Sequence, residues 1–274
     1  MMAVFTLWSA AFAFQQCRFI ESRLDNVATP DDVGAKTEYY FARLKYQNVT
    51  HGPPVNWLAP QPDYWTYGRP DYWMRRGNWQ VDYPKAERTF MKGVQRLSRV
   101  NARQMEQVVD LESDDIYNYP WIYAVEAGHW DLPQNQADKL RDYLLKGGFL
   151  MLDDFHGSFD WSIFTASMKR VFPDRPITDI PNPDPIFHTL YDLDDRYQVP
   201  GAVMCFTHLT YEYDGYEAKW RAIRDDNGRI MVAICHNVDL GDAWEHADHP
   251  DYPERYSALA YRIGLNYIIY AMTH

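Results

Sequence analysis

The sequence has few cysteines, and their spacing forms no recognisable motif. Cys17, Cys205 and Cys235 are the three cysteines of a 274-residue chain, and no C-x-x-C pair occurs. A disulfide framework and a structural zinc site both need characteristic cysteine spacings, so neither is indicated. One disulfide could form in an oxidising compartment.

Positive charge is also scarce. The chain has 27 Lys and Arg against 38 Asp and Glu, which gives a formal net charge of -11 and a pI near 5.2. Nucleic-acid binders need clustered Lys and Arg to neutralise phosphates. Anionic lipid surfaces select basic segments for the same reason. We therefore expect no nucleic-acid partner.

A long apolar run of membrane-spanning length is missing from the N-terminus. Residues 1–14 read MMAVFTLWSAAFAF, uncharged but too short for a comfortable span. They resemble the apolar region of a signal peptide, and residues 11–13 resemble its cleavage pattern. No Lys or Arg precedes the run, and the residues before Cys17 do not form a lipobox. We expect export to a periplasmic or extracytoplasmic, membrane-associated location; the alternative is an apolar helix packed on the domain or a partner.

Aromatic residues, by contrast, are abundant. They make up 16% of the chain, including 10 Trp and 21 Tyr. Many lie in a proline-rich segment that carries the tetrapeptide Pro-Asp-Tyr-Trp twice, at residues 62–65 and 70–73. Two copies are too few for a repeat array. The segment is typical of a long loop that covers a face or grips a ligand or partner.

From residue 39 onward, strand and helix patterns alternate along the chain. We predict strands at 39–46, 104–111, 121–125, 149–152, 202–213 and 229–237, with a turn at 225–228. Helices are predicted to start at Pro84, Pro133, Trp161 and Pro253. This alternation predicts a three-layer α/β domain over residues 39–274, with a mostly parallel, flavodoxin-like sheet. Residues 1–38 form an apolar segment and an arm.

Polar side chains follow two of the predicted strands. The stretch FLMLDDFHG, residues 149–157, runs from four apolar residues into two carboxylates and an imidazole. The strand ending at Cys235 is followed by His236, Asn237 and Asp239. Ligands of doubly wound sheets bind beyond the carboxyl ends of the strands. We expect both strands to end at the same edge and to share one pocket.

The segment LRDYLLKGGFLMLDDFHG resembles the helix, glycine turn and strand that lead to the nucleophile elbow of class I glutamine amidotransferase-like domains. More closely, four segments resemble a bacterial family known only as domain of unknown function 4159, placed in that superfamily. They are DYPKAERTF, GGFLMLDDFHG, RIMVAICHNVDLGDAWE and YRIGLNYIIYAMTH. The resemblance implies an amidotransferase-like fold and no particular reaction.

The same resemblance places Asp154 where those enzymes carry a catalytic cysteine. Amidotransfer needs a thiolate nucleophile. Cys235 lies on another strand without an elbow pattern around it. We therefore predict no glutaminase activity.

Two chemical interpretations of the polar residues remain open beside simple loop capping. The first is a metal site, with carboxylate and imidazole ligands. Its candidates are Asp153, Asp154, His156, His236 and Asp239, with His246 and His249 nearby in sequence. The second is an Asp154 nucleophile for ester or halide hydrolysis. His156 or His236 would be its base, and Asp239 or Asp242 would orient that base.

Two binding interpretations use the aromatic residues instead. Carbohydrate recognition would combine Trp and Tyr faces with Asp and Asn. Docking to a membrane protein complex, respiratory or photosynthetic for example, would use the apolar N-terminus and the aromatic loop. The expected partner contacts are Phe5, Trp8, Trp57, Trp65, Trp73 and Trp79. Our prediction is a non-catalytic docking or structural subunit without a cofactor; a metal-dependent or Asp-nucleophile hydrolase and a carbohydrate-binding module are the alternatives.

Overall fold

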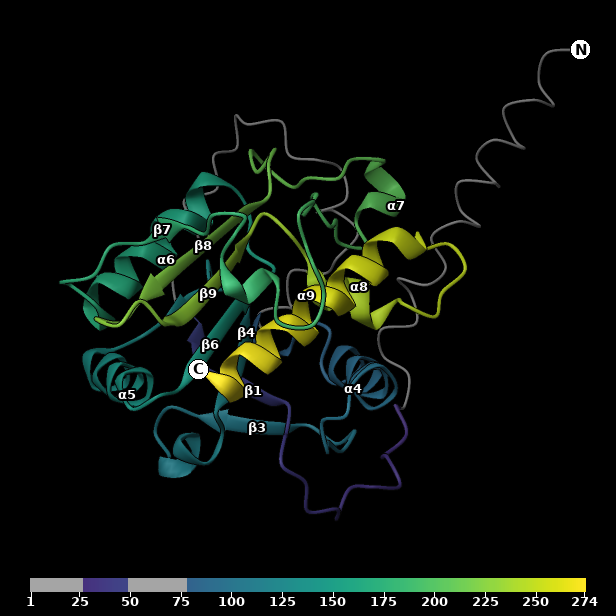
Figure 1. Ribbon diagram of the computed structural model, residues 1–274. Coiled ribbons are helices and arrows are strands. Elements are labelled where there is room, and N and C mark those ends of the chain that lie inside the picture. The colour runs from purple at the N-terminus through teal and green to yellow at the C-terminus, as the bar shows by residue number, and fades with distance from the viewer. Residues whose placement is uncertain (1–26, 49–77) are drawn as a thin grey trace, which may run out of the picture.

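The computed structural model describes residues 27–48 and 78–274, which form one mixed sheet between two layers of helices (Figure 1). The strand order is β3-β1-β4-β6-β9-β8-β7. Strands β1, β3, β4, β6 and β9 run parallel. Strand β8 pairs antiparallel with β9, and β7 pairs antiparallel with β8. The strands are β1 (Ala42–Lys45), β3 (Gln107–Asp110), β4 (Trp121–Val125), β6 (Phe149–Asp153), β7 (Thr178–Asp179), β8 (Lys219–Arg224) and β9 (Ile230–His236). A separate ribbon pairs β2 (Gln47–Asn48) with β5 (Trp130–Asp131).

Helices cover both faces of this sheet. One face carries α4 (Lys85–Leu97), α8 (Leu240–Glu245) and α9 (Glu254–Thr273), and the other carries α5 (Gln134–Leu145) and α6 (Gly157–Val171). Among the described residues, four short helical turns lie in the connections: η3 (Asn78–Gln80), η4 (Asp114–Asn118), η5 (Pro185–Phe187) and α7 (Met204–Thr207). The predicted three-layer α/β fold with a mostly parallel sheet is confirmed.

The central strands are apolar on both faces because both faces are covered. Along β6, Phe149 and Met151 enter the buried cluster under α4, α8 and α9. Leu150 and Leu152 enter the cluster under α5 and α6. Strand β6 is thus buried along its whole length, so its carboxyl end is held at one fixed position within the sheet.

Three helices begin immediately after a proline, close to where the sequence predicted. Pro84, Pro133 and Pro253 are the N-cap residues of α4, α5 and α9. Proline pre-sets a helical φ and needs no amide partner, so it suits a helix start. On α4, Phe90 and Val94 are buried, whereas Leu97 near its end is exposed.

The strand predicted at residues 202–213 is wrong. This segment forms α7, which ends at His208 in a left-handed conformation, and a loop. The position beside β9 is taken by β8 instead. A tight turn at Asp225–Gly228, closed by Gly228 N donating to Asp225 O at 3.1 Å, joins the two strands. The segment nearest in sequence therefore takes the pairing, and the loop is left to cross the carboxyl edge.

Most residues expected to contact a partner lie outside the described residues: Phe5, Trp8, Trp57, Trp65 and Trp73. Trp79 is described and is half-buried, with its ring centroid 5.8 Å from that of Tyr83. Within residues 27–48 and 78–274, no helix combines the length and apolar character needed to cross a membrane.

Candidate functional site

Three neighbouring parallel strands, β4, β6 and β9, end at the same edge of the sheet, and a left-handed polar residue follows each of them. Glu126, Asp154 and Asn237 have φ angles of 53°, 51° and 65°. Backbone bonds tie these turns together: Glu126 N donates to Asp154 O, Asp154 N to Val238 O and Asn237 N to Phe155 O, at 3.0–3.1 Å. Left-handed non-glycine residues are uncommon and cluster at functional sites. This edge is therefore the candidate site.

Asp154 stands at the elbow between β6 and α6 and holds the ring of His156. His156 Nε2 lies 3.3 Å from Asp154 Oδ1, and both side chains are buried. The backbone N–H of His156 donates to Asp160 Oδ2 at 3.0 Å, which fixes the start of α6. The other ring nitrogen, Nδ1, is buried without a hydrogen-bond partner among the described residues. The ring is thus held through one nitrogen, and the other remains available.

The loop that crosses this edge brings Glu212 to the site. Tyr213, the next residue, is left-handed with φ 50°, and Gly215 N donates to Glu212 O at 2.9 Å. Gln198 Nε2 ties the loop down by donating to Gly215 O at 2.8 Å and to Asn237 O at 2.9 Å. The loop is therefore anchored to the end of β9, and Glu212 is kept close to His156.

The charges of Glu212 and His156 shift each other's protonation. Burial opposes protonation of His156, but the carboxylates of Glu212 and Asp154 outweigh it and raise the His156 pKa to about 9. Burial raises the pKa of Glu212 to about 6, although the charge of His156 opposes that rise. At neutral pH the pair is therefore mostly an imidazolium beside a carboxylate.

Beside Asp154, at the end of β4, His129 lies near the carboxylates of Glu126 and Asp160. His129 Nε2 is 3.3 Å from Glu126 Oε2 and 4.0 Å from Asp160 Oδ1. Burial and the negative charges of Asp154 and Asp160 raise the pKa of Glu126 well above its usual range. Burial likewise raises the pKa of Asp160, with His129 opposing. These carboxylates extend the negative potential of the site.

One carboxylate oxygen of Asp153, the last residue of β6, accepts three hydrogen bonds. Its Oδ2 accepts from Tyr123 OH, Leu240 N and Gly241 N at 2.8, 2.8 and 3.0 Å. Burial and the charge of Asp154 raise the pKa of Asp153 to about 7, against the effect of these donors. The carboxyl group thus rests on the first turn of α8.

Asp239 and Asp242 stand at the start of α8. Asp239 Oδ1 caps the helix by accepting from Asp242 N at 2.7 Å, and Asp242 Oδ2 accepts from Ala202 N at 2.5 Å. Burial, followed by the charges of Asp154, Asp242 and Asp82, raises the Asp239 pKa well above its usual range. Eight carboxylates therefore influence one another at this edge, and we call them the acidic cluster: Asp82, Glu126, Asp153, Asp154, Asp160, Glu212, Asp239 and Asp242.

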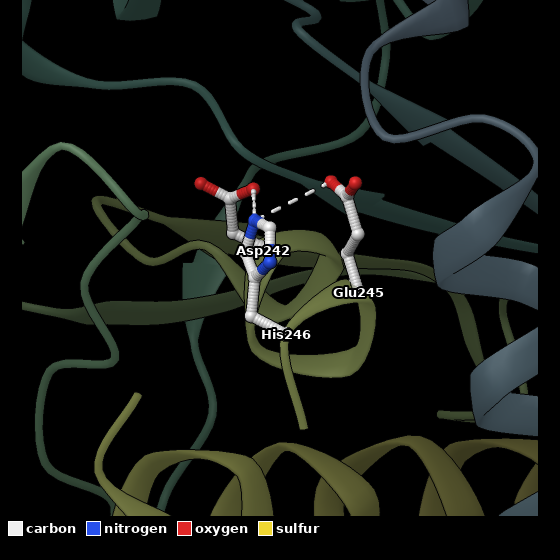
Figure 2. A group of neighbouring side chains, drawn as sticks. All are labelled: Asp242, Glu245 and His246. Atoms are coloured by element: carbon white, nitrogen blue, oxygen red, sulfur yellow. Dashed lines mark ion pairs between the residues drawn. The ribbon is translucent and has the colours of Figure 1, made fainter. Parts of the chain in front are cut away.

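Further along α8, Asp242 and Glu245 flank the ring of His246 (Figure 2). His246 Nε2 lies 3.5 Å from Asp242 Oδ1 and 3.6 Å from Glu245 Oε2, and all three residues are buried. His249 lies outside this group, with its Nδ1 3.9 Å from Asp251 Oδ2. Only one of the two histidines of the His-x-x-His segment thus joins the carboxylates.

His236 is engaged elsewhere. Its ring lies 5.0 Å from that of Phe155 and 4.8 Å from that of Trp161, centroid to centroid. Its Nε2 is 3.1 Å from Gly157 O and its Nδ1 is 3.3 Å from Arg221 Nη1, so Nε2 donates and Nδ1 accepts. Burial lowers the His236 pKa to about 4. These contacts favour a neutral ring that joins β9 to α6.

The structure therefore brings together five of the residues that the sequence singled out: Asp153, Asp154, His156, Asp239 and Asp242. Sequence reasoning missed Asp82, Glu126, Asp160 and Glu212. Glu126 could have been found because it directly follows the strand predicted at residues 121–125. Glu212 had no such signal, since it lay inside the segment that was predicted as a strand. Cys235 is buried within β9, and burial raises the pKa of its thiol well above the usual range.

Residues 66–272 match the family described as a domain of unknown function (DUF4159). The chain belongs to this family. The DUF4159 match extends from ahead of Asp82 to beyond Asp242, so it includes every member of the acidic cluster. No curated protein matches the chain. The family description names no reaction, so the chemistry has to be argued from the site.

Proposed function

We propose that this edge of the sheet is the active site of a hydrolase that acts on esters, with His156 as general acid and Glu212 as general base. The observation that carries the proposal is the position of His156. Asp154, in a left-handed elbow, holds its Nε2, while Nδ1 is buried without a partner among the described residues. A ring nitrogen held at a fixed position and available for proton transfer is what general acid catalysis requires.

Each group has one role in the proposed reaction. The Glu212 carboxylate takes a proton from water as the water oxygen bonds to the ester carbon. The carbon–oxygen bond to the leaving group then breaks, and the proton on His156 Nδ1 passes to the leaving alkoxide. Asp154 is a positioning residue that accepts from His156 Nε2–H and stabilises the imidazolium. Exchange with solvent returns the proton from Glu212 to His156, so protons balance over the cycle.

The effect of removing His156 on activity should depend on the leaving group of the ester. His156→Ala is expected to lower kcat/KM for a simple alkyl ester by about 100-fold, because an alkoxide needs a proton to leave. A p-nitrophenyl ester should be affected much less, since nitrophenolate leaves without one. The alkyl ester is followed by titration of released acid at constant pH, and the nitrophenyl ester by absorbance.

The control for this experiment is His188→Asn, a histidine outside the acidic cluster whose Nδ1 lies 2.9 Å from Asp192.

Wild-type activity should need Glu212 ionised and His156 protonated, so it should fall below about pH 6 and above about pH 9. Equal losses on both ester types, or no activity on either ester in the wild type, would contradict the assignment.

We also infer that this α/β fold is that of the class I glutamine amidotransferase-like superfamily, as the sequence suggested. The support is the order of strand β6, left-handed Asp154 and helix α6, which is how a nucleophile elbow is built. Because this elbow carries the carboxylate of Asp154 and not a cysteine thiolate, we still predict that the protein has no glutaminase activity.

Docking to a membrane protein assembly, in a periplasmic location, stays a second proposal based on residues 1–14 and the aromatic loop. Most of its expected contacts lie outside the described residues. Deletion of residues 1–14 should leave a folded domain, seen by circular dichroism, that no longer co-purifies with its native complex. Unchanged co-purification would move the contacts to the loop, and an unfolded product would place residues 1–14 in the core.

A further inference from the structure

Three carboxylates, from Asp82, Asp239 and Asp242, converge around the first turn of α8. We propose that, together with Asp153, they form a binding site for one hard divalent cation, such as Ca²⁺, Mg²⁺ or Mn²⁺. One oxygen from each of Asp82, Asp239 and Asp242 lies within 4.8 Å of the others. The inference is separate from the proposed ester hydrolysis, because binding is measured without a substrate.

Two glycines, Gly201 and Gly241, leave space for the carboxylates of Asp82, Asp239 and Asp242. A Cβ on Gly241 would stand 2.6 Å from Asp82 Oδ2 and 3.6 Å from Asp239 Oδ1. A Cβ on Gly201 would stand 2.6 Å from Asp239 Oδ2 and 3.2 Å from Asp242 Oδ2. Real Cβ atoms do not approach so closely, so any larger residue would displace a carboxylate. Backbone without a side chain thus borders the site on two sides.

Asp153 supplies an independent observation. Its Oδ2 is fixed by three donors, whereas its Oδ1 is fully buried and has no hydrogen-bond partner among the described residues. Tyr123 OH, one of those donors, stands 3.1 Å from the same Cβ position on Gly241 that Asp82 Oδ2 approaches. A buried carboxylate oxygen without a donor is unfavourable unless a cation or a proton satisfies it. The remaining oxygen of Asp153 is therefore suited to coordinate a cation.

The ligand set also indicates the kind of cation. Carboxylate oxygens suit Mg²⁺, Ca²⁺ and Mn²⁺, whereas thiolate and imidazole select softer metals. The group in Figure 2 differs, because His246 stands between its two carboxylates and can itself carry positive charge. In the group of Asp82, Asp239 and Asp242 all three ligand side chains are acidic. We therefore place the cation on the Asp82 side of Asp242.

Titration calorimetry with MnCl₂ tests the site on the full chain. One saturable Mn²⁺ site per chain is expected, with competition by Ca²⁺ or Mg²⁺. Asp239→Asn should weaken Mn²⁺ binding at least tenfold while keeping α8 capped, because asparagine caps as well as aspartate. Gly241→Ala should weaken binding similarly by pushing Asp82 aside, although it removes no ligand. Alanine also favours a helix more than glycine does, so this variant should fold.

Two controls accompany these variants. Asp226→Asn removes an exposed carboxylate, and Gly34→Ala adds a Cβ where no atom lies within 4 Å. Neither should change Mn²⁺ affinity. Absence of saturable binding in the wild type, or unchanged affinity in both Asp239→Asn and Gly241→Ala, would overturn the site and show that protons alone stabilise these carboxylates. Absence of ester hydrolysis in a wild-type protein that does bind Mn²⁺ would overturn only the hydrolase.

Discussion

Replacing Arg43 by methionine is expected to lower the free energy of unfolding by about 3–5 kcal/mol. Arg43 Nε lies 2.5 Å from Glu87 Oε1, and neither side chain is exposed. Methionine keeps much of the aliphatic volume but leaves the Glu87 carboxylate buried without its cation. Burial already raises the Glu87 pKa, with Arg43 opposing that rise. Without Arg43 the pKa should rise further, because the opposing charge is gone.

The higher pKa of Glu87 in Arg43→Met determines how the loss of unfolding free energy depends on pH. A carboxyl whose folded pKa lies above its unfolded value favours the folded state at low pH, and this contribution disappears as pH rises through the folded pKa. Urea unfolding should therefore show a larger deficit for Arg43→Met at pH 8 than at pH 5. A deficit that does not change with pH would contradict the mechanism.

Two variants serve as controls for the buried pair. Combining Arg43→Met with Glu87→Leu should recover most of the loss, because no charge is then left buried alone. Lys45→Met, on the same strand, breaks an exposed pair with Asp110 and should cost under about 1 kcal/mol. A double variant as unstable as Arg43→Met would mean that packing, and not charge, sets the loss.

Replacing Trp244 by alanine is expected to cost about 3–5 kcal/mol. Its fully buried ring stacks on Phe90, with centroids 4.2 Å apart, and lies 5.4 Å from the ring of Tyr123. Helix α8 is only six residues long, and this ring packs it against Phe90 of α4 and Tyr123 of β4. Because α8 carries Asp242, the same change should also weaken Mn²⁺ binding.

Thermal and urea unfolding would measure the Trp244→Ala loss, with Trp244→Phe as the matched control. The Trp244 Nε1–H is buried without a hydrogen-bond partner among the described residues. Phenylalanine keeps an aromatic ring and removes that donor, so its cost should be smaller, about 1–2 kcal/mol. Equal losses in the two variants would show that the aromatic contacts do not hold α8 in place.

The candidate site was only partly predictable. The prediction that the strands ending near Asp153 and Cys235 share one edge is confirmed by the parallel pairing of β6 with β9. Periodicity identifies buried strands, and parallel strands place their carboxyl ends together. The role of His236 was harder to judge, because its contacts with Trp161 and Arg221 are set by side-chain packing between β9, α6 and β8.

The sequence by itself determined the layered α/β fold, the helix starts at the prolines and the polar ends of the central strands. These features are local, since they depend on side-chain period and on the fixed φ of proline. Only the tertiary structure decided which carboxylates meet. Glu212 and Asp82 come from loops outside the central strands, and no local pattern marks where a loop crosses a sheet edge. Their positions follow from long-range contacts, with Gln198 holding one loop and the bare backbone of Gly241 admitting Asp82.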